Sequence, residues 1–448
     1  MNTPAFRDLN LIDPLLKALD AVGYTHPTPI QLQAIPPLLE GHDLLGCAQT
    51  GTGKTAAFAL PLIQNLKKNP IRYNAKQPRI LVLTPTRELA IQVHDNFVEY
   101  SKFVNLKTSV IFGGVGQAPQ VKSMLGGVDV LVATPGRLLD LINQRHVSLR
   151  ELEVFVLDEA DRMLDMGFIH DIKKIIALLP EKRHNLFFSA TMPKEIEQLA
   201  NTILRNPIRV AVAPVSSTAE LIEQRVMFVD KDKKRDLLKH LFQDPSLSKV
   251  IIFTRTKHGA NKVSEVLTKA GIKSDAIHGN KSQTARQNAL NNFKDGKIRA
   301  LIATDIAARG IDVDDITHVI NFELPHEPES YVHRIGRTAR AGAKGKAIAF
   351  CDAEEKSLLK QIEKVIKMEV PLDSNQPYHS VNVEGARILK PGQAKALIES
   401  RGPSRPPQRG RRPQEGRRPP EGRTSDKPRT ENRFPKKKFR SPAAKKND

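Results

Sequence analysis

Two segments in the first half of the chain carry residues suited to phosphate chemistry. Residues 48–55 read Ala-Gln-Thr-Gly-Thr-Gly-Lys-Thr, between the apolar Leu44–Leu45 and a helix-like stretch at 56–66. Glycines let backbone N–H groups approach phosphates, Lys54 can reach the β/γ oxygens, and Thr55 can offer its hydroxyl to Mg²⁺ at a helix N-terminus. A strict phosphate loop begins with glycine where this chain has Ala48, so the loop needs support from its context. The nucleotide contacts expected in it are Thr50, Gly51, Thr52, Gly53, Lys54 and Thr55.

Paired carboxylates follow about a hundred residues later. The apolar Val154–Leu157 runs directly into Asp158-Glu159-Ala160-Asp161. A strand that ends in two acids is where a phosphate-loop enzyme holds its metal and activates water. We therefore expect Asp158 to bind Mg²⁺ and Glu159 to orient or deprotonate water. A solvated acidic turn is the alternative, which the upstream loop disfavours; Ser189-Ala190-Thr191 after the next strand can be turn chemistry alone.

The elements that must position these residues alternate between short apolar and longer amphipathic stretches. This alternation is typical of parallel βαβ units and predicts an α/β fold. The Pro/Ser/Thr-rich residues 213–219 separate two such series, so we expect domains at 1–212 and 220–370, then an extension at 371–400 with a helical stretch near 392–400. The strands expected are 80–83, 128–133, 154–157, 185–188 and 208–212 in the first domain, and 224–229, 250–253, 274–277, 300–303, 318–322 and 347–350 in the second.

Further segments extend the pattern beyond the loop and the acids. Residues 23–31 read Gly-Tyr-Thr-His-Pro-Thr-Pro-Ile-Gln, with Phe6 upstream, and residues 333–340 read His-Arg-Ile-Gly-Arg-Thr-Ala-Arg. With these the chain resembles the DEAD-box RNA helicases over roughly residues 6–370, most closely the bacterial RhlE type. The resemblance implies two tandem RecA-like domains and an ATPase that unwinds short RNA duplexes locally when ATP and RNA close the domains.

For the nucleotide, the resemblance assigns roles to residues in both halves. Gln31 would read the adenine edge, which suits a carboxamide that donates and accepts in one plane, and Tyr24 would stack on the base. Arg337 and Arg340 lie one helical turn apart and would be arginine fingers, a device worth about 10³–10⁵ in rate. The remaining contacts implied are Gly310 near the phosphates and Asp312 on the ribose.

For RNA, the resemblance points to residues just beyond strand ends, where α/β sheets bind ligands. All of them suit phosphate contact rather than base-edge recognition, which predicts little sequence specificity. The RNA contacts expected are Arg87, Gly114, Thr134, Arg137, Gln283, Arg286 and Thr304.

The charge of the chain is concentrated near its end. Residues 401–448 hold 17 Lys and Arg against 5 Asp and Glu, within a formal net charge of +21, and contain no Leu, Ile, Val or Met. This composition predicts a disordered basic tail that binds polyanions; a solubilising tail without a specific partner is the alternative. Two distant cysteines, no apolar run of membrane-spanning length and no secretory N-terminal pattern indicate a cytoplasmic protein.

Three other functions compete with this hypothesis. A DNA helicase or translocase would keep the enzyme class, a non-enzymatic RNA chaperone would act through the tail, and a small-molecule kinase would leave the second half unexplained. ATP turnover measured with RNA and with DNA separates them. The partners expected are duplex and single-stranded RNA around a monomeric core, while ribosome assembly, RNA decay and cold adaptation all stay open as roles.

Overall fold

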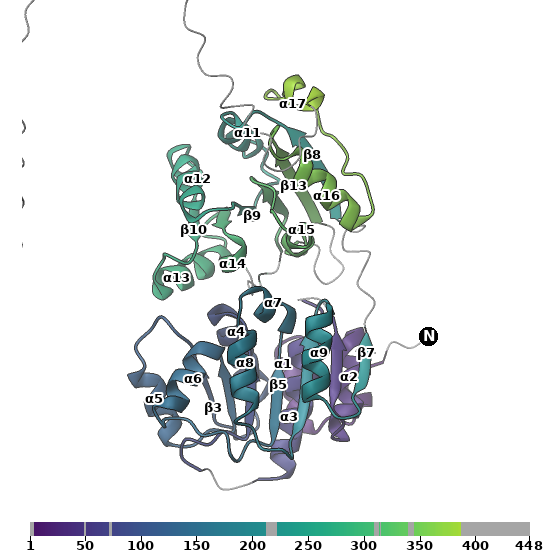
Figure 1. The fold of residues 1–448 in the computed structure, drawn as a ribbon, viewed down its shortest axis with the longest axis vertical. Coiled ribbons are helices and arrows are strands. Elements are labelled where there is room, and N and C mark those ends of the chain that lie inside the picture. Colours follow the sequence, from purple (N-terminus) through teal and green to yellow (C-terminus); the bar gives the residue numbers. More distant parts are fainter. Residues whose placement is uncertain are drawn as a thin grey trace, which may run out of the picture. The chain divides into compact units, whose positions relative to one another are not determined.

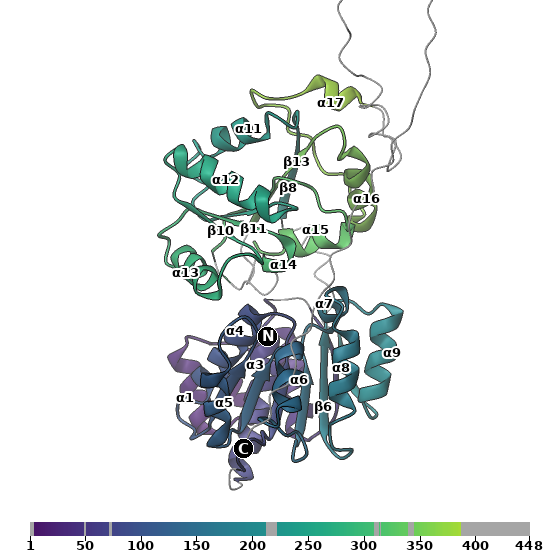
Figure 2. The same ribbon diagram turned by 60° about the vertical axis from the view of Figure 1, so that its left-hand side comes forward.

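The computed structural model describes residues 4–48, 51–70, 74–211, 222–308, 313, 315–338 and 345–386. These residues form two α/β domains in succession, each around one parallel sheet (Figures 1 and 2). The expected residues Thr50, Gly310, Asp312 and Arg340 lie outside the described ranges, as do the segments at 213–219, 392–400 and 401–448. No described helix is long and apolar enough to cross a membrane.

The first domain has a seven-stranded sheet of order β3-β4-β2-β5-β6-β1-β7. Its strands are β1 (Leu44–Cys47), β2 (Ile80–Leu83), β3 (Thr108–Ile111), β4 (Val130–Ala133), β5 (Val154–Leu157), β6 (His184–Ser189) and β7 (Ile208–Ala211). Its helices are η1 (Phe6–Leu9), α1 (Asp13–Ala21), α2 (Pro29–Leu39), α3 (Lys54–Lys68), α4 (Arg87–Tyr100), α5 (Ala118–Leu125), α6 (Pro135–Asn143), α7 (Ala160–Asp165), α8 (Ile169–Ile176) and α9 (Lys194–Ile203).

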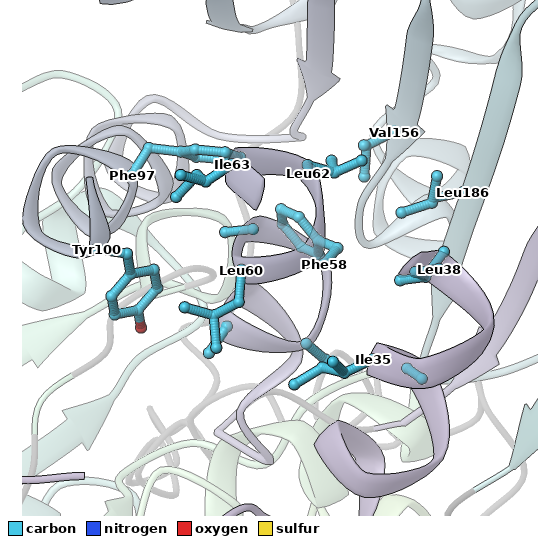
Figure 3. Close-up of a cluster of buried hydrophobic side chains, with 14 of the residues drawn as sticks. Ile35, Leu38, Phe58, Leu60, Leu62, Ile63, Phe97, Tyr100, Val156 and Leu186 are labelled. Atoms are coloured by element: carbon cyan, nitrogen blue, oxygen red, sulfur yellow. The ribbon is translucent and has the colours of Figure 1, made fainter. Parts of the chain in front are cut away.

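Strand residues of the first domain alternate between two hydrophobic cores. Val82 and Val156 face the core built with α1–α4, while Leu81 and Phe155 face the core built with α5–α9. Side chains of a strand point alternately to opposite faces, so a strand covered on both sides must be apolar throughout. Figure 3 shows Phe58 of α3 amid the first core, where its ring lies 6.2 Å from that of Phe97 and 5.4 Å from that of Phe188.

The second domain has a six-stranded sheet of order β10-β11-β9-β12-β13-β8. Its strands are β8 (Ile222–Phe228), β9 (Val250–Phe253), β10 (Ser274–Ile277), β11 (Ala300–Ala303), β12 (His318–Asn321) and β13 (Gly345–Cys351). Its helices are α11 (Lys234–Leu241), α12 (Lys257–Lys269), α13 (Gln283–Lys294), α14 (Asp305–Ala308), α15 (Pro328–Ile335), α16 (Lys356–Ile366) and α17 (Val381–Gly385). Helices α11 and α12 cover one face, and α13–α16 cover the other.

The strand predictions are confirmed for β2, β5, β9, β10 and β11, whose bounds agree residue by residue. The other predicted strands differ by one or two residues at an end: β4 begins at Val130, β7 ends at Ala211 and β12 ends at Asn321. β6 and β13 are longer at both ends, and β8 begins two residues earlier and ends one residue earlier than predicted. Two strands were missing from the prediction. β1 contains Gly46, which weakens a strand pattern but packs closely against Phe188, and β3 is an edge strand whose residues alternate in exposure.

The strand orders decide what can meet at the carboxyl edge of each sheet. In the first sheet, β5, β6 and β1 are adjacent, so Asp158, Ser189 and the loop after Cys47 emerge side by side. β3, β4 and β2 form the other half of that edge and bring together the turns at Gly113, Thr134 and Pro85. The phosphate loop and the paired acids therefore occupy one half of this edge, and the first-domain residues expected at RNA lie at the other half.

Candidate nucleotide and RNA sites

The phosphate loop has the backbone that its glycines permit. Gly51 and Gly53 have φ of 84° and 91°, the left-handed region that favours glycine. A Cβ on Gly53 would lie 2.4 Å from Nε2 of Gln31, so that position is also closed sterically. Helix α3 begins at Lys54 directly after this turn, which directs the N-terminus of a helix at the loop.

Gln31 connects the segment at 23–31 to this loop. Its Oε1 accepts from the backbone N–H of Thr28 at 2.8 Å and its Nε2 donates to the carbonyl of Gly53 at 3.1 Å. The amide therefore fixes the start of α2 against the phosphate loop. Tyr24, by contrast, is 41% exposed, with its ring stacked on Phe6 at 6.4 Å. A flat aromatic surface with an open face can accept a base.

Lys54 and Asp158 form a buried pair that is incompletely satisfied. Nζ of Lys54 lies 3.9 Å from Oδ1 of Asp158, and neither atom has a hydrogen-bond partner among the described residues. Burial raises the pKa of Asp158 to about 6, against the opposing charge of Lys54. Buried polar atoms without partners are costly, so this pair suits ligands: an ammonium for phosphate oxygens and a carboxylate for a hard cation such as Mg²⁺, which needs only one or two protein carboxylates.

The other two acids of the quartet are held by protein groups. Glu159 has left-handed backbone angles (φ 57°, ψ 52°), and its Oε2 accepts from Nη1 of Arg162 at 2.6 Å. Asp161 accepts from the backbone N–H and the hydroxyl of Thr191 at 2.9 and 3.0 Å, while Ser189 accepts from the Asp161 N–H. The Ser189–Thr191 segment thus positions α7. Arg162 was missed in the sequence, where only its spacing of three from Glu159 could have indicated it.

In the second domain, one arginine of the His-Arg-Ile-Gly-Arg segment is structural. Arg334 is 1% exposed and holds Asp305 through two hydrogen bonds of 2.6 and 2.8 Å, with further bonds to Asn321 and the carbonyl of Glu323. Arg337, the expected finger, is buried and donates from Nε to the carbonyl of His333 at 3.2 Å. Arg334 therefore fixes the segment from which Arg337 extends.

The RNA residues of the first domain meet at the β3-β4-β2 half of the edge. The guanidinium of Arg87 packs on Gly114, where a Cβ would lie 2.1 Å from its Nη1. Arg137 donates to the carbonyl of Val115 at 3.1 Å. Burial and the neighbouring Arg286 and Arg137 lower the pKa of Arg87, partly opposed by Glu88. Clustered guanidinium groups raise each other's energy until an anion compensates them, so this cluster favours phosphates.

Glu88 binds two of the three second-domain residues that were expected at RNA, Gln283 and Arg286. Its Oε1 accepts from Gln283 Nε2 at 3.1 Å and its Oε2 pairs with Arg286 Nη2 at 2.9 Å. Glu88 is 3% exposed, so it compensates Arg286 in a protected setting. Sequence reasoning missed it, although it follows Arg87 directly. Thr304 lies at the end of β11, where its carbonyl accepts the first bonds of α14.

Histidines do not build a metal centre in the described part of the chain. No group of three or more His, Cys, Asp or Glu side chains there could hold a metal ion. His278 lies instead 2.8 Å from the amide oxygen of Asn261. Cys47 and Cys351 are free thiols.

Comparison with known families agrees with this geometry. The DEAD/DEAH box helicase family matches residues 28–199, and the helicase conserved C-terminal domain matches residues 232–342. These matches include the phosphate loop and the acids in one domain and Gln283, Arg286 and Arg337 in the other.

Relatives and solved structures extend the likeness to most of the chain. The ATP-dependent RNA helicase DeaD of Buchnera aphidicola is 44% identical over 366 residues, which are 82% of this chain and 60% of that protein. CshA of Bacillus subtilis is 42% identical over 82% of this chain and 74% of its own length, and RhpA of Helicobacter pylori is 42% identical over the same shares.

Two solved structures show the same architecture. Saccharomyces cerevisiae Dbp5, solved with RNA and ADP-BeF3, is 31% identical with a TM-score of 0.72 over 82% of this chain and 95% of that one. A DEAD box protein of Methanococcus jannaschii is 40% identical over 82% of this chain and 99% of that one, with a TM-score of 0.50. With RecA-like domains, a phosphate loop beside its acids and these relatives, the chain belongs to the DEAD-box ATP-dependent RNA helicases.

Proposed function

We propose that this protein hydrolyses ATP in response to RNA and uses the reaction to unwind short RNA duplexes locally. The observation that carries the proposal is the buried pair of Lys54 and Asp158, 3.9 Å apart and lacking hydrogen-bond partners on Nζ and Oδ1. A fold retains such a pair at a strand end when a ligand completes it. The chain spans 60% of DeaD and about three quarters of CshA and RhpA, so the activity of those proteins is transferred here as a proposal.

In the proposed reaction, Lys54 and the N–H groups of residues 50–55 bind the phosphates. Thr55 and Asp158 would hold Mg²⁺, which neutralises phosphate charge. Glu159 orients the attacking water, and Arg337 with Arg340 stabilises charge on the transferred phosphoryl group. Gln31, Tyr24, Gly310 and Asp312 hold the nucleoside and the adjoining phosphates. Because Lys54 and Arg337 belong to different domains, the site would be complete only when the domains close.

For RNA, the guanidinium cluster of the first domain supports backbone binding. Arg87, Gly114, Thr134 and Arg137 would bind phosphates from the first domain, and Gln283, Arg286 and Thr304 from the second. Contacts of this kind position a strand without reading its bases, so sequence specificity should be low. A strand bent away from duplex geometry would fit such a track, which explains local melting.

The setting of this activity is also a proposal. We infer a cytoplasmic protein with a monomeric core, acting on structured RNA in ribosome assembly or RNA decay. The RhlE subtype stays a prediction, since the relatives named above are DeaD, CshA and RhpA. The 17 basic residues at 401–448 would tether the core to RNA. Deleting them should weaken RNA binding and flatten its salt dependence while RNA-independent ATP turnover stays intact; unchanged affinity over a salt series would contradict the tether.

The decisive experiment is ATP turnover with no nucleic acid, with RNA and with DNA, in the 448-residue chain and in Arg337→Ala. We expect stimulation by RNA alone and its loss in Arg337→Ala by a factor of at least about 10³. Equal stimulation by DNA would favour a DNA translocase, and RNA binding without turnover would favour a chaperone. An Arg337→Ala protein with the wild-type RNA-stimulated rate would refute the proposal that domain closure completes the catalytic site.

A further inference from the structure

A second basic residue accompanies the acids of the candidate active site. Lys54, Asp158, Glu159 and Arg162 are all at least nine-tenths buried. They form a compact group of two positive and two negative charges at the carboxyl edge of the first sheet. Buried ions require counter-ions close by, so the group must be understood as a whole rather than as single residues.

The two halves of this group differ in geometry. Lys54 and Asp158 are 3.9 Å apart, whereas Arg162 Nη1 lies 2.6 Å from Glu159 Oε2. The short distance is that of a charge-assisted hydrogen bond. Glu159 is the N-cap residue of α7 and Arg162 lies three residues later in its first turn, where the two side chains form their ion pair. The left-handed backbone of Glu159 further limits where its carboxylate can point.

Binding of a nucleotide changes the partners of the first half only. On the proposed function, Lys54 turns to phosphate oxygens and Asp158 to the cation that accompanies them. The ion pair of 2.6 Å between Glu159 and Arg162 involves neither Lys54 nor Asp158, so it can persist when those two side chains turn to the ligand. A carboxylate that orients water must keep one direction during closure of the site.

We propose that Arg162 is the positioning residue of Glu159: its guanidinium holds the carboxylate in the orientation that directs the attacking water. This inference rests on the proposed function and assigns a role to a side chain outside the phosphate loop, the paired acids and the arginine fingers. Arg162 acts through Glu159, so its loss should reduce turnover without weakening the binding of ATP.

The test combines Arg162→Gln and Arg162→Lys with Glu159→Gln in the 448-residue chain. RNA-stimulated hydrolysis is followed at saturating RNA, with single-turnover measurements for the slow variants. We expect Arg162→Gln to lower kcat about 10- to 100-fold, the usual cost of losing a residue that orients a catalytic group, with KM for ATP within about twofold of wild type. Arg162→Lys, which keeps the charge, should give an intermediate kcat.

The double variant separates positioning from general damage. In the Glu159→Gln protein, Arg162→Gln should cause no further loss, because the carboxylate it orients is already absent. Arg79→Gln is the matched control, since it breaks the Arg79–Glu153 ion pair of 2.5 Å at the opposite edge of the same sheet and should leave kcat unchanged.

Several results would overturn the inference. They are an unchanged kcat in Arg162→Gln, a further loss in the double variant, or a rise in RNA-independent turnover, which would make the pair a restraint on Glu159. If Arg162→Gln does not fold, Arg162→Lys decides: a wild-type kcat rejects positioning and an intermediate kcat at unchanged KM supports it. Absence of RNA-stimulated turnover in the wild type would instead refute the proposed function.

Discussion

The two domains each hold a group of two basic and two acidic side chains at the carboxyl edge of a parallel sheet, and all of these are buried except the half-buried Arg255. In the first domain these are Lys54, Asp158, Glu159 and Arg162, and in the second Lys234, Arg255, Asp352 and Glu355. In the second group each side chain has an oppositely charged partner within hydrogen-bond distance, although Nε of Arg255 has no hydrogen-bond partner in the described part of the chain. Lys234 lies 3.0 Å from Asp352 and 2.5 Å from Glu355, and Arg255 lies 2.5 Å from the other oxygen of Glu355. Glu355 also accepts the backbone N–H groups of Leu324 and Asp352.

The two charge groups differ in how completely their acids and bases satisfy each other. The second group ties the ends of β9, β12 and β13 to α11 and leaves little for a ligand to gain. The first group keeps Lys54 and Asp158 too far apart for a hydrogen bond. The degree of satisfaction of buried charges, rather than their presence, therefore marks the site that awaits a substrate.

The largest effect should follow from Lys54→Gln. This change removes the basic side chain in the first turn of α3 that we propose binds the phosphates, so RNA-stimulated ATP turnover should fall at least about 10³-fold. The melting temperature should fall by less than in Lys234→Met, since Lys54 makes no hydrogen bond through Nζ that the fold would lose and Asp158, whose pKa is raised by burial, can take up a proton. Phosphate release during ATP hydrolysis and thermal unfolding are measured for the variant and for the wild type. Turnover within tenfold of wild type would mean that Lys54 does not bind the phosphates.

Lys234→Met should show the opposite profile. It leaves Asp352 and the 1%-exposed Glu355 short of a counter-ion, a loss that typically costs about 3–5 kcal/mol. We expect the second domain to unfold at lower denaturant concentration, while kcat under native conditions stays close to wild type. Denaturant titration with both readouts checks this. A Lys234→Met protein of wild-type stability with impaired turnover would show that the second charge group contributes to catalysis.

Much of this architecture could be predicted from the sequence. Short apolar strands indicate parallel sheets, and the motif residues that follow them indicate which residues lie at the carboxyl edge of each sheet. β2, β5 and β9 agree with their predicted bounds for that reason. The strands β1 and β3 escaped prediction, since Gly46 depends on a tertiary contact with Phe188 and β3 is half exposed. Glu88, Arg162 and Arg334 also escaped: which arginine pairs with which acid depends on side-chain distances that spacing alone does not determine.

A pH series should distinguish the first charge group by a smaller effect. Because burial raises the pKa of Asp158 from 3.8 to about 6, this carboxyl is protonated below about pH 6 and cannot bind a cation. The Mg²⁺-dependent affinity for a fluorescent ATP analogue should be constant above pH 7 and fall by up to about tenfold per pH unit below 6. An affinity that stays constant down to pH 5 would contradict either the raised pKa of Asp158 or its role as a ligand of the cation.

The smallest effect should come from Thr191→Val. This variant tests Asp161, an acid of the first domain whose hydrogen bonds are satisfied by protein groups, as are those of Glu355 in the second domain. Asp161 is satisfied in the manner of Glu355, and its bond from the Thr191 hydroxyl is one of several that hold α7 to the end of β6. Removing that hydroxyl should lower the free energy of unfolding by about 1 kcal/mol and turnover by only a few fold, since Lys54, Asp158 and Glu159 keep their own contacts. Unfolding and turnover are measured on the same preparation. If Thr191→Val instead lowered turnover as severely as Lys54→Gln at unchanged stability, Asp161 would belong with the ligand-binding charges, and the distinction between satisfied and unsatisfied acids would fail within one helix turn.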